Sequence, residues 1–568
     1  MRLLIWITLA AGLAACSGSG APPAAPAPRA ARPAGTVPAI TAADLQARME
    51  IFAHDSMLGR EAGTIGNVKG TDYIATELRR LGLDPAGENG TYFQTVTMVA
   101  RGPDTMRVIT VGDVTLRFRT DWIPVPSLGF FPFGTQGSID GAAVIFGGRL
   151  GADLVDPAQA AGKVVLFLPP TPGGQPNFQF WGEGGNEVLT RYADARGIVI
   201  ASLDISPPQI ANILTQEQED MAAGSVHASG GPLGILVTAT AAQALLGMDP
   251  ATASPGHAGR TVGGGPAFLE QPVPFPARNV VALLPGSDPV RRGTYVAMGV
   301  HNDHVGLVDT PVEHDSLRAY DRVIRPGGAE NQPRRPTAEE QARIRQIVDS
   351  LRLTRPPRMD SVRNGADDDG SGSVTLLEMA EYFVSQPRRP ARSLLFIWHT
   401  GEEKGLFGSQ YFTEHPTVPR DSIVAELNMD MIGRGSVADI DGGGPGYMQM
   451  IGSRRLSTEL GDLVETVNTE GSFGFAFDYQ FDADGHPQNY YCRSDHYMYA
   501  RFGIPIAFFT TGSHPDYHML TDEAQYIDYA KMTRVGTFVA AIATRVANMD
   551  HRPVVDKPLP DPYGVCQQ

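Results

Sequence analysis

From residue 276 onward, short apolar runs alternate with amphipathic segments, and this alternation is the strongest constraint on the fold. In chain order the apolar runs are RNVVALLPG, TYVAMGVH, RSLLFIWHT, SIVAELNMDMIG and IPIAFFTT. Between them, SGSVTLLEMAEYFVSQ and LFGSQYFTEHP have the spacing of helices, and a last helix is predicted over residues 522–549. Continuously apolar strands are buried on both faces, and strands that alternate with helices form largely parallel sheets. We therefore predict an α/β fold with a mixed, largely parallel central sheet flanked by helices.

The first half of the chain shows two other patterns. Residues 41–83 read as two helices, and the first of them follows Thr41, a favoured N-cap residue. Between residues 107 and 270, brief apolar runs such as AAVIFGG and GIVIAS are bounded by Gly and Pro, which is typical of short strands. We predict that residues 107–270 form a β-rich domain inserted between two parts of one α/β domain, residues 39–106 and 271–552.

The N-terminal segment, residues 1–16, has the features of a bacterial lipoprotein signal. Arg2 precedes an apolar run too short to span a membrane, and the run closes on Leu-Ala-Ala-Cys, in which Cys16 is the residue to be lipidated. An ordinary secretory signal is the alternative. Residues 17–38 read as an extended Ala/Pro-rich tether, and Ser17 favours the outer membrane. We predict an exported lipoprotein of the cell envelope that is anchored through Cys16 and faces the periplasm or the cell surface.

Net charge and cysteine content limit the partners and the covalent links. The formal net charge of −16 argues against a nucleic-acid-binding protein. Besides Cys16 the chain has Cys492 and Cys566, the second of which lies in the C-terminal tail, residues 553–568. An oxidising compartment permits a disulfide between them, but the sequence leaves their pairing open.

Polar side chains follow the buried runs of the second half, at the points where the predicted strands end, and three aspartates precede the predicted helix SGSVTLLE. In chain order they are His301, Asp303 and His304; Asp367, Asp368 and Asp369 of GADDDGSG; Glu402 and Glu403; Asp430; and Tyr517 and His518. Because the carboxyl ends of parallel strands meet at one sheet edge, these groups are expected to converge. Carboxylates this close together need a divalent cation as compensation. Imidazole and carboxylate ligands without a thiolate suit Zn²⁺, with Co²⁺ or Mn²⁺ as possible substitutes.

These motifs resemble the co-catalytic zinc exopeptidases, the family of bacterial aminopeptidases and glutamate carboxypeptidases. The matching segments are GVHNDH, GADDDGSGSVTLLE, HTGEEKGLFGS, ELNMDMIG, RSDH and YHMLTDE. The β-rich region, with GKVVLFL and ADARGIVIAS, is similar to a protease-associated domain. The resemblance implies the zinc exopeptidase fold for the α/β domain, interrupted by an insertion at residues 305–363 that is longer than this family's usual connector.

Position by position, the resemblance implies two Zn²⁺ ions and the residues that serve them. The implied ligands are His301 and Asp430 for one ion, Glu403 and His518 for the other, and Asp368 as the bridge between both. Glu402, beside a ligand, is implied as the general base that takes a proton from the attacking water. Asp303 is implied to hydrogen-bond and orient His301, and Tyr517 to donate a hydrogen bond to the developing oxyanion.

Supporting roles are expected for the neighbours of these residues. Asp369 is expected to hydrogen-bond locally and Asp367 to face solvent or an arginine. Asp522 is expected to cap a helix, and a supporting role behind the metal ligands is the alternative. A role for Ser494 and Asp495 in the specificity pocket stays open. Packing or hydrogen-bonding roles are expected for four nearby histidines, His304, His399, His496 and His514.

The leading functional prediction is a lipid-anchored zinc aminopeptidase that acts on peptide substrates. A glutamate-carboxypeptidase-like enzyme is the nearest alternative, because Arg363, Arg434 and Arg493 lie beside motifs and such an enzyme needs a cation for the substrate's terminal carboxylate. A non-catalytic binding lipoprotein on the same fold is a second alternative.

The insertion flanks two implied ligands, so it is expected at the rim of the site, either as a lid or as a solvated excursion. The oligomeric state stays open.

Overall fold

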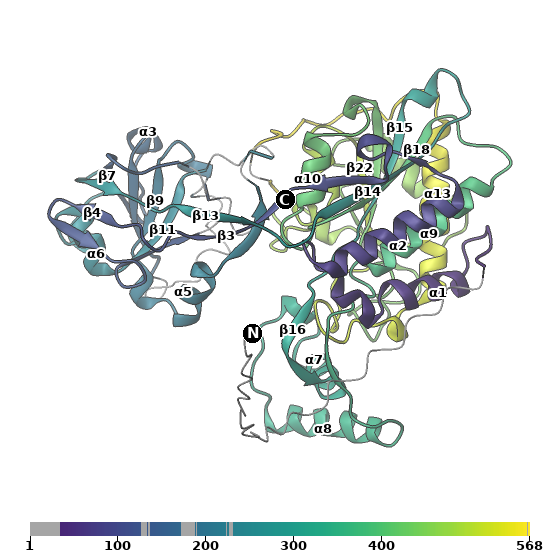
Figure 1. Ribbon diagram of the computed structural model, residues 1–568, viewed down its shortest axis with the longest axis horizontal. Coiled ribbons are helices and arrows are strands. Elements are labelled where there is room, and N and C mark those ends of the chain that lie inside the picture. Colours follow the sequence, from purple (N-terminus) through teal and green to yellow (C-terminus); the bar gives the residue numbers. More distant parts are fainter. Residues whose placement is uncertain are drawn as a thin grey trace, which may run out of the picture.

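The computed structural model describes residues 35–125, 133–134, 137–171, 188, 190–222, 224–225, 231–564 and 566–568. The predicted signal peptide, Cys16 and residues 17–34 of the predicted tether lie outside these ranges. Figure 1 shows an α/β body, a β-rich lobe to one side of it, and a smaller projection that carries α7 and α8. Among the helices of the described ranges, none is long and apolar enough to cross a membrane.

The body is built around a nine-stranded sheet with the order β1-β14-β18-β15-β19-β22-β20-β21, in which β2 also pairs with β14. The four strands β18, β15, β19 and β22 are parallel neighbours, and β14 and β20 flank them in antiparallel orientation. The prediction of a mixed central sheet is therefore confirmed. The strands are β1 (Asp84–Pro85), β2 (Phe93–Val96), β14 (Ala277–Leu284), β15 (Tyr295–His301), β18 (Ser393–His399), β19 (Ile423–Met429), β20 (Tyr447–Ile451), β21 (Ala476–Asp478) and β22 (Ile506–Thr510).

Helices cover both faces of this sheet, which explains why its strands are continuously apolar. In β18, Phe396 and Trp398 enter one core while Leu395 and Ile397 enter another, because successive side chains of a strand point to opposite faces. The first core includes side chains of α1, α2, α9, α11 and α13, and the second includes side chains of α10 and α12. These helices are α1 (Ala42–Phe52), α2 (Ile65–Leu81), α9 (Gly370–Ser385), α10 (Phe407–Glu414), α11 (Thr458–Glu470), α12 (His496–Ala500) and α13 (Tyr529–Asn548).

Helix starts follow their capping residues. The predicted cap at Thr41 is confirmed, since its side chain accepts a hydrogen bond from the amide of Asp44 at 3.1 Å. The last helix was predicted to begin at residue 522, but α13 begins at Tyr529. The reason is that Asp528, and not Asp522, is the cap: its carboxylate accepts from the Lys531 amide at 2.9 Å.

The β-rich lobe contains an eight-stranded sheet with the order β5-β4-β12-β7-β8-β9-β11-β6. Its strands are β4 (Ile109–Val111), β5 (Val114–Leu116), β6 (Trp122–Val125), β7 (Ala143–Arg149), β8 (Val164–Leu168), β9 (Gly197–Ile200), β11 (Leu233–Val237) and β12 (Ala258–Gly264), and its helices are α3 (Pro157–Ala160), α5 (Pro208–Thr215) and α6 (Ala239–Leu246). A three-stranded sheet runs from the lobe toward the body (Figure 1); it consists of β10 (Gln218–Met221), β3 (Met98–Pro103) and β13 (Phe268–Pro272).

The insertion between β15 and α9 folds into the smaller projection. Strands β16 (Leu307–Glu313) and β17 (Met359–Val362) pair in antiparallel orientation, and helices α7 (His314–Ile324) and α8 (Ala338–Arg352) lie between them in the chain. Ala319, Ile324 and Ile344 form a small core of its own. At the other end of the chain, Cys492 and Cys566 form a disulfide that ties the C-terminal tail to the body.

Candidate metal centre

The candidate site lies at the carboxyl ends of the parallel strands. β15 ends at His301, β19 ends one residue before Asp430, and Asp368 precedes the start of α9. Glu403 lies in the turn that follows β18, and His518 in the loop that follows β22. The structure thus brings all five predicted metal ligands to one edge of the sheet, where parallel strands place their carboxyl ends.

One group of donor atoms is centred on His301. Its Nε2 lies 3.1 Å from Oδ1 of Asp368 and 3.5 Å from Oδ1 of Asp430. The Ser494 hydroxyl donates a hydrogen bond to the other oxygen of Asp430, Oδ2, at 2.9 Å. Asp430 is thereby held with Oδ1 toward His301, and these three residues form one possible metal site.

A second group of donor atoms surrounds the other oxygen of Asp368. Nε2 of His518 lies 3.0 Å from Asp368 Oδ2 and 2.8 Å from Glu403 Oε2. Nδ1 of His304 contacts Glu403 Oε1 at 2.7 Å, as its predicted hydrogen-bonding role requires, and His304, Asp368 and Glu403 also form a possible metal site. Asp368 therefore presents one carboxylate oxygen to each of the two groups of donor atoms.

The side chains of the site fit a divalent cation, because their buried donor atoms face one another without forming hydrogen bonds. The nearest ion-pair contacts of His301 Nε2, Asp368 Oδ2 and Asp430 Oδ1 are 3.1, 3.0 and 3.5 Å long, yet none of these three atoms has a hydrogen-bond partner. Burial lowers the pKa of His518, but Glu403 and Asp368 raise it to about 10, so the imidazole holds a proton that a cation would displace. Neutral imidazoles and ionised carboxylates are donors that Zn²⁺ accepts.

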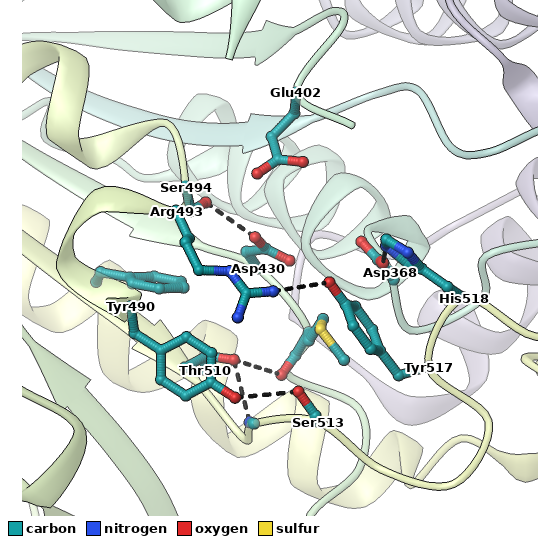
Figure 2. Close-up of a pocket in the computed structure, with 13 residues that line it drawn as sticks. Asp368, Glu402, Asp430, Tyr490, Arg493, Ser494, Thr510, Ser513, Tyr517 and His518 are labelled. Carbon is teal, nitrogen blue, oxygen red and sulfur yellow. Dashed lines mark hydrogen bonds and ion pairs between the residues drawn. The ribbon is translucent and has the colours of Figure 1, made fainter. Parts of the chain in front are cut away.

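Glu402 and Tyr517 face the pocket beside these groups. Figure 2 shows their side chains on opposite sides of it, with Asp430 and Arg493 between them. Burial raises the pKa of Glu402 well above its ordinary value, and the charges of Asp430 and Glu403 raise it further. Burial likewise raises the pKa of Tyr517 far above the usual range, so its phenol keeps the proton needed for donation.

Asp303 reaches His301 in a different way from the one predicted. Nδ1 of His301 contacts the backbone carbonyl of Asp303 at 3.1 Å, while the nearest carboxylate oxygen, Oδ1, is 3.9 Å away. That Oδ1 instead accepts a hydrogen bond from the amide of Glu402 at 3.2 Å. The predicted side-chain hydrogen bond to His301 is therefore replaced by a backbone contact, because the carboxylate supports the turn that carries Glu402.

The three adjacent aspartates have three different environments. Asp369 accepts hydrogen bonds from the amides of Gly372 at 2.8 Å and His301 at 3.1 Å, which confirms its predicted local role. The prediction that Asp367 faces solvent or an arginine is wrong: it is fully buried, and its carboxylate contacts Nε2 of His514 at 3.1 Å. The peptide bond between Asp368 and Asp369 is cis.

Two residues outside the predicted set hold the backbone of this aspartate segment. Asp522 accepts hydrogen bonds from the amides of Asp367 at 3.0 Å and Asp368 at 3.1 Å, so its predicted role as a helix cap is wrong. Arg60 donates to the carbonyl of Asn364 at 2.6 Å and to that of Gly365 at 2.9 Å. Arg60 lies in the segment GREAGT between the two predicted N-terminal helices, and no pattern in that polar loop distinguishes it from an exposed arginine.

The remaining histidines and Asp495 lie beneath the site. His399 Nε2 contacts the hydroxyl of Tyr499 at 2.9 Å, and its Nδ1 is 3.4 Å from a carboxylate oxygen of Asp495. His496 stacks on the Phe508 ring with centroids 4.5 Å apart. These histidines have the predicted packing and hydrogen-bonding roles, whereas Asp495 is buried beneath the pocket and does not line it.

A further cluster of ligand-type residues joins the insertion to the body. Nε2 of His314 lies 3.1 Å from Oε2 of Glu523, and Asp360 is close to both. Arg358 makes an ion pair with Glu523 and another with Asp360 at 3.2 Å. Because the guanidinium compensates both carboxylates, this cluster is an ionic contact between the insertion and the segment that follows His518.

Comparison with known proteins relates the body of the chain to peptidases. Residues 279–543 match Peptidase family M28. A probable leucine aminopeptidase of Arthroderma benhamiae is 28% identical over 246 residues, which is 42% of this chain and 60% of that protein. Leupeptin-inactivating enzyme 1 of Streptomyces exfoliatus is 30% identical over 171 residues, which is 29% of this chain and 34% of that protein. The chain thus spans 60% or less of the length of these two relatives.

Among solved structures, an aminopeptidase from Aneurinibacillus sp. strain AM-1 aligns with 92% of this chain and 97% of its own length, at 16% identity and a TM-score of 0.44. A zinc aminopeptidase from Bacillus subtilis aligns with 92% of this chain at 15% identity and a TM-score of 0.43.

Proposed function

We propose that this protein is a zinc-dependent aminopeptidase that hydrolyses the N-terminal residue of peptides. The observation that carries the proposal is the position of Asp368, whose two carboxylate oxygens face two separate groups of imidazole and carboxylate donors. The match of residues 279–543 to a peptidase family, and relatives named as aminopeptidases, support a metallo-exopeptidase.

Each predicted site residue has a place in this proposal. His301 and Asp430 would hold one zinc ion, Glu403 and His518 the other, with Asp368 shared. When bound, two such ions supply the positive charge that polarises a carbonyl and makes a water molecule acidic. The carboxylate of Glu402 accepts the proton of the attacking water and returns it to the leaving amine. The hydroxyl of Tyr517 donates a hydrogen bond to the oxyanion that develops on the substrate.

The arginines considered for a carboxypeptidase are engaged by acidic residues or by the backbone. Arg434 is buried and contacts Asp439 at 2.7 Å and Asp516 at 2.8 Å. Arg493 pairs with Glu330 at 2.6 Å. Arg363 donates to the carbonyl of Val305 at 3.4 Å. A carboxypeptidase must offer a cation to the terminal carboxylate of its substrate, so these pairings favour the aminopeptidase.

The presence of Glu402 beside the full ligand set favours an enzyme over a binding protein.

The proposal extends to cellular location and domain roles. We propose that the protein is exported and anchored to the membrane through a lipid on Cys16, and that the β-rich lobe is a protease-associated domain. The sequence of residues 1–16 and the segments GKVVLFL and ADARGIVIAS support these two statements. Replacing Cys16 by serine is expected to move the protein from the membrane fraction to the soluble fraction. A membrane-bound Cys16→Ser variant would contradict the lipid anchor.

Matched substrates with free and blocked amino groups test the proposed activity. The purified protein is expected to release nitroaniline from leucine p-nitroanilide but not from its N-acetyl form, because an aminopeptidase requires the free amine. A zinc chelator is expected to abolish the reaction, and added Zn²⁺ to restore it. The measurement is the initial rate for each substrate, together with the metal content of the protein. Hydrolysis of the acetylated substrate, or a rate that the chelator leaves unchanged, would overturn the proposal.

A further inference from the structure

The insertion reaches the mouth of the pocket through one short turn, η8 (Gly328–Glu330). The amide of Ala329 donates a hydrogen bond to the carbonyl of Tyr517 at 3.1 Å. Gly328 has a φ of +55°, and a Cβ at this position would lie 2.5 Å from the same carbonyl. The turn therefore packs directly against the loop that carries Tyr517 and His518, and only glycine permits this approach.

The same turn places a carboxylate beside the pocket. Oε1 of Glu330 lies 2.6 Å from Nη2 of Arg493, and both side chains are about four-fifths buried, with exposed fractions of 21% and 20%. Nη2 of Arg493 also donates to the hydroxyl of Tyr517 at 3.4 Å. Figure 2 shows Arg493 extending through the pocket toward Tyr517. An acidic residue of the insertion is thus linked through Arg493 to a residue that the proposed function places at the reacting carbonyl.

We propose that Glu330 is a positioning and specificity-determining residue: it holds Arg493 against Tyr517 and, by its charge, excludes substrate carboxylates from this side of the pocket. This inference rests on the proposed aminopeptidase function, and it assigns the enzyme to peptides that are neutral at the position facing Arg493. The insertion is then part of the substrate site and not a solvated excursion.

The chemistry of the guanidinium group explains the selection. An arginine that lines a pocket is a strong receptor for carboxylates, because its planar N–H groups match the two carboxylate oxygens. Glu330 already occupies this receptor at Nη2, so a substrate carboxylate would both compete for the arginine and be repelled by Glu330. Without the charge of Glu330, the guanidinium becomes a receptor for the substrate.

Neutral and charged substrates of the same shape test this inference. One arm compares glutamate with glutamine p-nitroanilide, which differ only in the side-chain carboxylate. The other arm compares Leu-Leu with Leu-Leu-amide, which differ in the terminal carboxylate. For each pair, the ratio of kcat/KM for the charged over the neutral substrate is measured in the wild type and in variants.

Glu330→Gln is expected to raise this ratio about tenfold or more in at least one arm. The reason is that the substrate carboxylate gains a hydrogen bond to the guanidinium of Arg493. The gain should appear mainly as a lower KM for the charged substrate. Glu330→Asp keeps the charge and is expected to keep the wild-type ratio. Glu340→Gln is the matched control, since Glu340 belongs to the same insertion but pairs with Arg334 on the surface at 2.7 Å. A merely structural role for Glu330 would lower the rates for both substrates alike, and an unchanged ratio in Glu330→Gln would overturn the inference.

A binding measurement keeps this test separate from the proposed function. If the wild type hydrolyses neither neutral substrate, the aminopeptidase proposal fails. In that case, binding affinities for Glu-Leu-amide and Gln-Leu-amide, measured by calorimetry, test whether the site discriminates against a carboxylate, because they do not depend on hydrolysis. Glu330→Gln is expected to favour the glutamate peptide relative to the wild type, and equal relative affinities in the two proteins would overturn the inference.

Discussion

Replacing Glu402, the proposed general base, by glutamine is expected to lower kcat by about 10²- to 10⁴-fold, the usual contribution of such a base, while bound Zn²⁺ is retained. Glutamine preserves the shape of the side chain but cannot accept a proton from water. The carboxylate of Glu402 lies 4.0 Å from His301 Nε2 and takes part in neither of the two donor groups. The measurements are kcat with leucine p-nitroanilide and the zinc content by elemental analysis.

The neighbouring Glu403 provides the matched control for this experiment. Its two oxygens contact His304 and His518 at 2.7 and 2.8 Å, so Glu403→Gln is expected to lose zinc as well as activity. Glu402→Gln and Glu403→Gln are thus expected to differ in zinc content, although the two residues are adjacent. The same loss of zinc in both variants would show that Glu402 is also a ligand. Near-normal turnover in Glu402→Gln would mean that another group acts as the base.

Replacing Arg48 by methionine is expected to destabilise the body by about 3–5 kcal/mol above neutral pH, where Glu378 must ionise, because the change leaves a buried carboxylate without its partner. Arg48 in α1 is fully buried and makes ion pairs with Glu378 and Glu381 of α9 and Glu77 of α2. The side chain of Glu378 is fully buried as well. The free energy of unfolding of the body is measured by urea titration with Trp398 fluorescence, since Trp398 lies in the core next to α9.

The same variant should show a characteristic dependence on pH. Burial raises the pKa of Glu378 to about 7 even with Arg48 present, above its value in the unfolded chain. A carboxyl group whose pKa is higher in the folded state stabilises the fold at low pH and loses this effect as the pH rises through the folded pKa. Removing Arg48 raises that pKa further, so the destabilisation should be small below about pH 4.5, the ordinary glutamate pKa, and should grow at and above neutral pH.

Arg80 is the control for Arg48. It contacts two of the same carboxylates, Glu77 at 2.9 Å and Glu381 at 3.2 Å, but its side chain is 44% exposed. Arg80→Met is expected to cost no more than about 1 kcal/mol, since exposed ion pairs contribute little. Equal losses in the two variants would show that burial of the charge is not what makes Arg48 important.

The strands of the body and the residues at their ends were predictable because both depend on local pattern. Runs such as RSLLFIWHT are apolar at every position because helices cover both faces of the strand. In the structure, alternate residues of β18 enter two different cores. Once the strands are parallel, the residues after them must share one edge. His301 and Asp430 therefore converge by topology, and Asp368 joins them because it precedes α9, the helix that follows β15 after the insertion and begins at the same edge.

The supporting contacts were not predictable in the same way. Asp367 and Asp522 are of a residue type that is common in exposed turns, yet both are fully buried, and Asp522 accepts hydrogen bonds from the amides of Asp367 and Asp368. Their partners lie far away in the sequence, so no local pattern distinguishes a solvated aspartate from one that accepts backbone amides in a buried loop.

By itself, the sequence determined the class of fold and the order of the polar groups along the chain, and it predicted which of these groups converge at one edge of the sheet. Only the tertiary structure decided which acidic groups serve the site from outside the motifs. Glu330 belongs to an insertion with no motif of its own, and it meets Arg493 across 163 positions of the chain. An ion pair of this kind depends on where two loops are placed in space, and that placement results from the packing of the insertion against the body, not from the spacing of residues in either loop.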